Sequence, residues 1–233
     1  MAYFFTTTIG KKLLVSITGL FLIIFLIEHL AVNMLIVFDD TGRLFNEAAY
    51  FLENNPIVSI IEPVLFIGFI LHILITVILS IQNLMQRDIN YAGFGRYKTR
   101  KSSVGSTWTS RNMLILGVFI FSFLVIHLQN FFWKMKFTGD PLLEAVIYDG
   151  VAMKNSYALV IATLTQCNWT VGLYVIGAIA LGLHLHHGIW SAFQSIGLSN
   201  NKWRKIFNGI GIILSIILGA GFAFIPLYVA IVH

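Results

Sequence analysis

The sequence predicts an all-α integral membrane protein: a single domain, residues 1–233, built as a bundle of five transmembrane helices. Two observations support this expectation. Hydrophobic residues make up 58% of the chain and charged residues 11%, whereas a soluble domain carries roughly 45–50% and about 25%. The apolar residues also gather in five long blocks, and crossing about 30 Å of hydrocarbon takes about 20 helical residues. This composition excludes a soluble enzyme, a disordered chain and a nucleic-acid-binding protein.

Each block is expected to be helical, because lipid offers no partner to backbone N–H and C=O groups. A cleaved signal peptide is the alternative for the first block, but its apolar stretch is too long and no small-x-small cleavage site follows it. We therefore expect a permanent helix there. In the longest irregular segment, 134–168, Ser156–Leu164 is apolar enough for a short helix on the membrane surface. The five blocks cover about 13–37, 57–84, 112–133, 170–193 and 206–232.

The segments between the blocks carry an orientation signal. Four of the basic residues, Arg43, Lys134, Lys136 and Lys154, fall on one side. The side richer in Lys and Arg is the cytoplasmic one, so we expect the N-terminus inside and His233 outside. The other eleven basic residues fall on this inner side: Lys11, Lys12, Arg87, Arg96, Lys98, Arg100, Lys101, Arg111, Lys202, Arg204 and Lys205.

Histidines inside the blocks are the first candidates for a functional site. His233 is terminal, and the other six of the seven histidines lie within the blocks, where ionisable residues are costly. Counting at 1.5 Å per residue puts His29 and His127 roughly 9–12 Å below the outer edge, and His72 and His184 roughly 14–18 Å above the inner edge. Two imidazoles that face each other across a bundle can ligate one haem iron. The sequence thus predicts two haems, stacked inside the first four helices.

Other residues near these depths are secondary candidates. Gly19 and Gly117 each precede a histidine by ten residues and lie near the inner pair, where glycine permits close approach of a flat macrocycle; the alternative is an ordinary helix contact. His187 shares the helix face of His184 and is an alternative ligand or a partner of a haem propionate, whereas His186 points elsewhere. The single cysteine, Cys167, allows neither an intrachain disulfide nor a covalent haem attachment motif.

Two carboxylates lie within the blocks, Glu28 beside His29 and Glu62 ten residues before His72. The count places Glu62 roughly 15 Å further out than the inner pair, close to the depth of the outer pair. Both are candidates for accepting protons from a quinol or lining a proton path. The alternative for Glu62 is a place near the interface, with Pro63 beginning the regular helix after it.

The chain resembles the dihaem cytochrome b subunit of succinate dehydrogenases and fumarate reductases over nearly its whole length. One histidine in each of the first four helices is the main feature. The closest local matches are Tyr174-Val175 and the run His184-Leu-His-His-Gly-Ile-Trp-Ser-Ala-Phe-Gln-Ser-Ile-Gly197, which supports His184 over His187 as the ligand. His29-Leu-Ala-Val-Asn33 and His127-Leu-Gln-Asn130 are also similar to the family's segments around its ligands.

The resemblance implies a multi-pass subunit of the bacterial cytoplasmic membrane that anchors a flavoprotein and an iron–sulfur protein on the cytoplasmic side. Electrons would pass through the inner haem b and then the outer one to a quinone, usually menaquinone, that reacts near the outer haem. A higher oligomer is compatible with this assignment. The basic residues Arg96, Lys98, Arg100 and Lys101 would face the partner subunits, although they also fit topology alone.

Three other functions remain open at this point. A dihaem subunit of a hydrogenase or formate dehydrogenase has similar ligands, but those enzymes usually place the catalytic subunit outside. His184-x-His-His is similar to the histidine box of a membrane di-iron oxidase, which needs around eight clustered ligands. A transporter could use the histidines as proton relays, but no internal repeat is evident.

Overall fold

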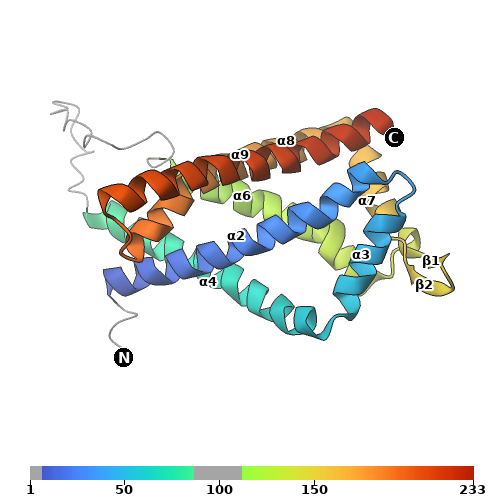
Figure 1. Cartoon of the computed structure of the whole chain (residues 1–233), viewed down its shortest axis with the longest axis horizontal. Helices are drawn as coiled ribbons and strands as arrows, with labels where there is room; N and C mark the ends of the chain where they lie inside the picture. Colours follow the sequence, from blue (N-terminus) through green and yellow to red (C-terminus); the bar gives the residue numbers. More distant parts are fainter. Residues whose placement is uncertain (1–6, 87–111) are drawn as a thin grey trace.

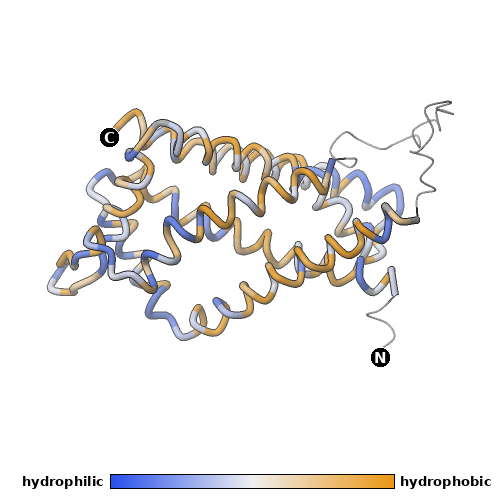
Figure 2. The backbone as a smooth tube through the Cα atoms, turned by 180° about the vertical axis from the view of Figure 1, so that it is seen from behind, coloured by the Kyte–Doolittle hydropathy of each residue, from blue (hydrophilic) through white to orange (hydrophobic). Residues whose placement is uncertain are grey.

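The computed structural model describes residues 7–86 and 112–233, and within them five helices are long and apolar enough to cross a membrane. They are α2 (Thr8–Phe38), α4 (Pro56–Gln86), α6 (Met113–His127) continued by the π-helix η2 (Leu128–Thr138), α8 (Asn168–Ser195) and α9 (Asn201–Val232). All run along the long axis of the molecule (Figure 1). Figure 2 shows hydrophobic residues along the helices and hydrophilic ones gathered towards both ends.

The five predicted blocks are confirmed as helices, and most of the helices extend beyond the predicted limits. Polar caps set some of these ends. The Thr7 hydroxyl accepts from Gly10 N at 3.1 Å, and the Asn200 side chain accepts from Trp203 N at 3.0 Å, so that α9 begins with a polar turn. A side-chain oxygen in this position satisfies a backbone N–H that the helix itself leaves unpaired. Hydropathy detects only the apolar part of such helices.

One end of the bundle carries extra structure, residues 39–55 and 139–167, which we call the cap. It contains α3 (Arg43–Asn54), the short 3-10 helix η3 (Pro141–Leu143), strands β1 (Ala145–Tyr148) and β2 (Val151–Lys154), and α7 (Ser156–Thr165). The all-α expectation omitted the antiparallel pair β1–β2. Its turn residues Asp149 (φ 50°) and Gly150 (φ 82°) both have positive φ, the backbone of a two-residue hairpin turn.

The short helix expected at Ser156–Leu164 is confirmed as α7, but half of its side chains are buried. It packs against α3, α8, α9 and η2. Leu159 is fully buried, and Val160 and Leu164 join Ile36, Phe45, Tyr174 and Val229 in an apolar cluster. The cap is therefore packed onto the bundle through α7.

The pairs of helices differ in how closely they pack against each other. Helices α8 and α9 form the closest pair, because Gly182 and Gly219 face each other: a Cβ built on Gly219 would lie 3.1 Å from the Gly182 Cα. Small residues that let backbones approach in this way are typical of helix contacts in membranes. Helix α2 packs on α4, α8 and α9, and α6 packs on α8. Within the described residues, α4 packs mainly on α2 and α3.

The predicted orientation rests partly on residues outside the described ranges, namely Arg87, Arg96, Lys98, Arg100, Lys101 and Arg111. The basic residues within the described ranges are divided between the two ends of the bundle in the predicted way. Lys11, Lys12, Lys202, Arg204 and Lys205 lie at the end where α2 and α9 begin, which we call the N-terminal end, and Arg43 and Lys154 lie in the cap.

Candidate functional site: two histidine pairs and a charged seam

Helices α2 and α6 bring His29 and His127 together on the cap side of the bundle. The centroids of the two imidazole rings are 5.8 Å apart, and their planes cross at 87°. Helices α4 and α8 bring His72 and His184 together towards the N-terminal end, with centroids 6.4 Å apart and planes at 73°. The structure thus pairs the four histidines as the depth count predicts.

The spacing of each pair matches that of two imidazoles sharing one metal ion. An imidazole nitrogen ligates a transition metal at about 2 Å, which puts the two ring centroids about 6 Å apart. Two buried ring nitrogens, Nδ1 of His127 and Nδ1 of His184, have no hydrogen-bond partner among the described residues. Buried polar atoms normally have a partner, so these rings fit a group that the chain itself does not supply.

We call His72 and His184, which lie towards the N-terminal end, the N-side pair, and His29 and His127 the cap-side pair. Contacts from helix α2 orient the His72 ring of the N-side pair. Nδ1 of His72 lies 3.2 Å from the backbone oxygen of Val15 and 3.2 Å from the Thr18 hydroxyl. Gly19 makes room for the same ring, because a Cβ at Gly19 would lie 3.1 Å from His72 Cε1. Gly117, by contrast, faces open space, since nothing lies within 4 Å of a Cβ built there. Of the two glycines, Gly19 therefore lies against a ligand candidate and Gly117 leaves room for a bulky group.

Aromatic side chains surround the cap-side pair. The Phe25 ring stacks on His29 at 5.2 Å, and Phe222 of α9 lies 5.8 Å from the same ring. Phe131 lies 5.2 Å from His127 and Tyr174 lies 6.0 Å from it. Tyr174 also accepts a hydrogen bond from Asn130 Nδ2 at 3.2 Å. These rings cover the two imidazoles with apolar surface, and they were not among the predicted site residues.

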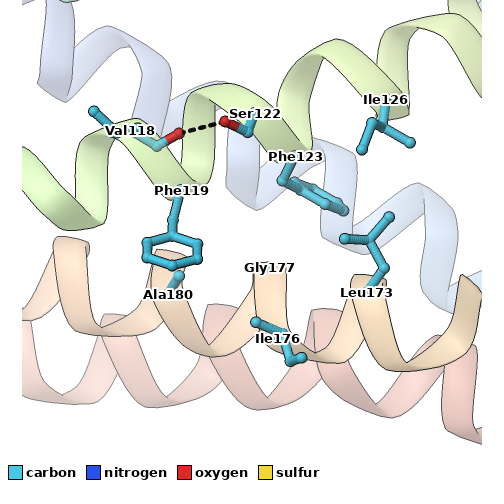
Figure 3. A pocket seen from close by; sticks show the side chains of 9 residues that line it. All are labelled: Val118, Phe119, Ser122, Phe123, Ile126, Leu173, Ile176, Gly177 and Ala180. Atoms are coloured by element: carbon cyan, nitrogen blue, oxygen red, sulfur yellow. Dashed lines mark hydrogen bonds between the residues drawn. The ribbon is translucent and has the colours of Figure 1, made fainter. Parts of the chain in front are cut away.

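A hollow of about 290 Å³ lies between α6 and α8, and Phe123 is one of the residues that line it (Figure 3). Phe123 points from α6 onto Gly177, where a Cβ would lie 2.7 Å from the phenylalanine ring. The hydroxyl of Ser122 already donates to Val118 O at 3.0 Å. The hollow therefore offers an apolar surface without a free polar group.

The two candidate carboxylates are placed differently. Glu28 is exposed on α2. Glu62 lies inside α4, which begins at Pro56, so the alternative in which Pro63 begins the regular helix is wrong: Pro63 is inside it. The Glu62 Oε2 forms an ion pair with Lys136 Nζ of η2 at 3.1 Å. One layer deeper, the Phe66 ring of α4 and the Phe132 ring of η2 are 4.9 Å apart. We call this contact between α4 and η2 the seam.

His186 and His187 lie on α8 next to His184 and are partly exposed. In the part of the chain that the structure describes, no group of three or more His, Cys, Asp or Glu side chains is arranged to hold a metal ion. The metal-binding candidates among these residues are therefore the two histidine pairs.

Comparison of the chain with protein-family models, with curated proteins and with solved structures found no match.

Proposed function

We propose that the chain is the membrane-anchor cytochrome b subunit of a succinate dehydrogenase or fumarate reductase. In this role it passes electrons between a cytoplasmic iron–sulfur subunit and a quinone, through two b haems in the bacterial cytoplasmic membrane. The observation that carries the proposal is the crosswise pairing of four intramembrane histidines, α2 with α6 and α4 with α8, at centroid distances of 5.8 and 6.4 Å.

Packing alone accounts poorly for this arrangement. The ring nitrogens of a buried histidine that serves packing alone are expected to have hydrogen-bond partners, because an unpaired buried polar atom is unfavourable. Within residues 7–86 and 112–233, Nδ1 of His127 and Nδ1 of His184 have no hydrogen-bond partner. Ionisable residues at this depth are rare unless they serve a function, and four of them in two pairs make a shared functional role the simpler explanation.

The residues have distinct tasks in this proposal. His29 and His127 would hold the iron of the outer haem, and His72 and His184 that of the inner one. A bound haem supplies reversible one-electron chemistry. Val15 fixes the orientation of His72 by accepting from its Nδ1, and the aromatic rings around His127 keep water away. His187, which lies three residues nearer the N-terminal end than His184, would contact a haem propionate.

The partners follow from the family resemblance. A flavoprotein and an iron–sulfur subunit would dock at the N-terminal end, where Lys11, Lys12, Lys202, Arg204 and Lys205 lie. The quinone, menaquinone in relatives of this type, would react at the cap side of the outer pair. Glu62 lies there in the seam, and Glu28 precedes His29; both are assigned to the protons that accompany quinone chemistry.

Spectroscopy of the purified full-length chain tests the proposal. We expect a reduced-minus-oxidised spectrum of low-spin b haem, with two haems for each chain. A tagged chain isolated from its own host in mild detergent should bring with it a flavoprotein and an iron–sulfur protein, and succinate should then reduce the haems. A chain that binds no haem would contradict the proposal, and haem without these partners would favour another respiratory complex.

A further inference from the structure

Helix α3 crosses the cap end of the bundle and does not run along it. It lies between Phe38, where α2 ends, and Pro56, where α4 begins. Figure 1 shows α3 at a steep angle to both of these helices, with the β1–β2 hairpin further out along the long axis. Since the long helices cross a membrane roughly along its normal, a helix in this position lies close to the plane of the membrane surface.

Two sides of α3 have partners within the protein. One side carries Phe45, which is buried in the apolar cluster between the bundle and α7. The next side faces the hairpin. There Asn46 Nδ2 donates to the Tyr148 hydroxyl of β1 at 3.5 Å, and Glu53 Oε1 accepts from Lys154 Nζ of β2 at 2.6 Å. The direction from α3 to the hairpin is therefore fixed by named contacts.

The side of α3 opposite the hairpin is apolar and exposed. Glu53 follows Leu44 by nine residues, which turn through about 900° and so place the two on opposite sides of the helix. Phe51 follows Leu44 by seven residues and lies within about 20° of it. Leu44 is 44% exposed and Phe51 64% exposed. We call Leu44, Phe51 and the half-buried Ala48 between them the apolar stripe; it faces away from the hairpin and back towards the level of the spans.

The exposed apolar surface of the spans reaches both ends of α3. Phe38 at the end of α2 is 73% exposed, and Ile57 at the start of α4 is 65% exposed, followed along α4 by the exposed Ile60. The chain becomes polar directly after Phe38, at Asp39 and Asp40. The border between hydrocarbon and the polar region therefore lies at the level of α3, and the apolar stripe continues the surface that α2 and α4 present to lipid.

A lipid surface accounts for the apolar stripe better than water or a second protein. Single exposed apolar side chains are common, but Leu44 and Phe51 share one side of an amphipathic helix, which is the pattern of helices that lie in a membrane interface. The stripe is one helix wide, and so small a patch falls short of the area that a stable protein interface buries. It is also continuous with the lipid-facing surface of the spans.

We propose that α3 is an interfacial helix whose apolar stripe inserts into the boundary between the acyl chains and the headgroups of the bilayer. Its hairpin side, with Asn46 and Glu53, then faces away from the membrane. The inference requires that the long helices span a membrane, but not that they hold haem, so it goes beyond the proposed function and does not depend on it. It gives α3 a lipid-binding role that sets the depth of the cap.

Nitroxide labels on single introduced cysteines test the inference in the full-length chain, reconstituted into vesicles of phosphatidylcholine and phosphatidylglycerol. Cys167 is the single native cysteine, and Cys167→Ser keeps a polar group beside the Thr170 hydroxyl. In this background Phe51→Cys labels the apolar stripe, and Glu53→Cys on the same helix is the matched control for the hairpin side. Ile67→Cys labels an exposed position within the α4 span. Power saturation compares collisions of each label with oxygen, which concentrates in hydrocarbon, and with a nickel chelate, which stays in water.

We expect the Phe51→Cys and Ile67→Cys labels to collide more with oxygen than with the chelate, and the Glu53→Cys label to show the reverse. Leu44→Cys is a second probe of the apolar stripe, which replaces Phe51→Cys if that variant does not fold, and its label should behave in the same way. A stripe label that resembles the Glu53→Cys label would place the stripe in water and overturn the inference. A stripe label shielded from both reagents would overturn it as well, because protein would then cover the stripe.

Discussion

Nδ1 of His72 lies 3.2 Å from the backbone oxygen of Val15. A carbonyl oxygen only accepts hydrogen bonds, so this contact requires the proton on Nδ1 and leaves Nε2 as the unprotonated nitrogen of the neutral ring. A hydrogen bond to the second ring nitrogen is the usual way in which a protein fixes the tautomer and orientation of a metal-binding histidine. The first span thus orients a candidate metal ligand that the second span carries.

On the proposed function, replacing one member of a histidine pair should remove the haem that the pair would hold. We expect His72→Ala to retain only the haem between His29 and His127, and His29→Ala to retain only the one between His72 and His184, because the remaining imidazole cannot complete the axial pair. Haem-to-protein ratios should fall from about two to about one. His186→Ala is the control and should keep both. Two haems remaining after either ligand replacement would show that the pairing is wrong.

Gly19→Ala should disturb the N-side haem selectively. The added Cβ would lie 3.1 Å from His72 Cε1, which is tighter than an ordinary contact, so the His72 ring must shift slightly. Overpacking of this kind destabilises by about 1–3 kcal/mol. We expect a shifted low-spin signal, or partial loss, of one haem in electron paramagnetic resonance spectra. Gly209→Ala is a matched control, because nothing lies within 4 Å of a Cβ there, and it should leave both signals unchanged.

Asn46→Ala should loosen the cap. The Asn46 side chain is 1% exposed; it donates to Asn155 Oδ1 at 3.1 Å and accepts from Tyr157 N at 2.8 Å. Removal leaves the Tyr157 N–H of α7 without this partner, at a cost of about 1–3 kcal/mol. We expect a lower thermal midpoint and faster proteolysis within 145–154. Asn54→Ala, which removes only an exposed bond to Tyr50 O, should cause neither change.

The cap should also lose stability in acid through Asp39. The Thr41 hydroxyl, together with the backbone N–H groups of Leu44 and Thr41, lowers the pKa of Asp39 from its ordinary value of 3.8. A lowered pKa means that the carboxylate stabilises the folded cap above pH 3.8 and that this contribution disappears as the pH falls through the lower value. The thermal midpoint of Asp39→Ala should therefore depend less on pH below about 4 than that of the original chain. Equal pH dependence in both would contradict this prediction.

The sequence was sufficient for the spans and for the pairing of the histidines. Long apolar blocks are the strongest local signal in a chain, and at 1.5 Å per residue the depth of a side chain follows from simple counting. His29 and His127 come together because the first and third helices run in the same direction and carry their histidines at equal depth. The aromatic surroundings were missed, since counting gives depth but not the face on which Phe222 or Tyr174 lies.

The sequence contains a signal for the β-hairpin, but none for the packing of α3 or for the ion pair between Lys136 and Glu62. Asp149-Gly150 between short apolar runs is a hairpin signal, and it marks the β1–β2 turn that the all-α expectation omitted. Helix α3 is short and amphipathic, and its buried Asn46 acquires partners only in the folded cap. The pairing of Lys136 with Glu62 could not be predicted, because α-helical stepping puts Lys136 on the side opposite His127 and the π-helical winding has no recognised sequence pattern.

Helix α4 packs mainly on α2 and α3 within the described residues, while its His72 reaches across to α8. Two coordinate bonds to one iron would thus fasten the second span to the fourth, two elements that otherwise share few direct contacts. Cofactor supply during biogenesis would then control when the bundle closes. We expect cells starved of haem to accumulate a chain whose second span is cleaved more readily by membrane proteases than that of the haem-replete chain.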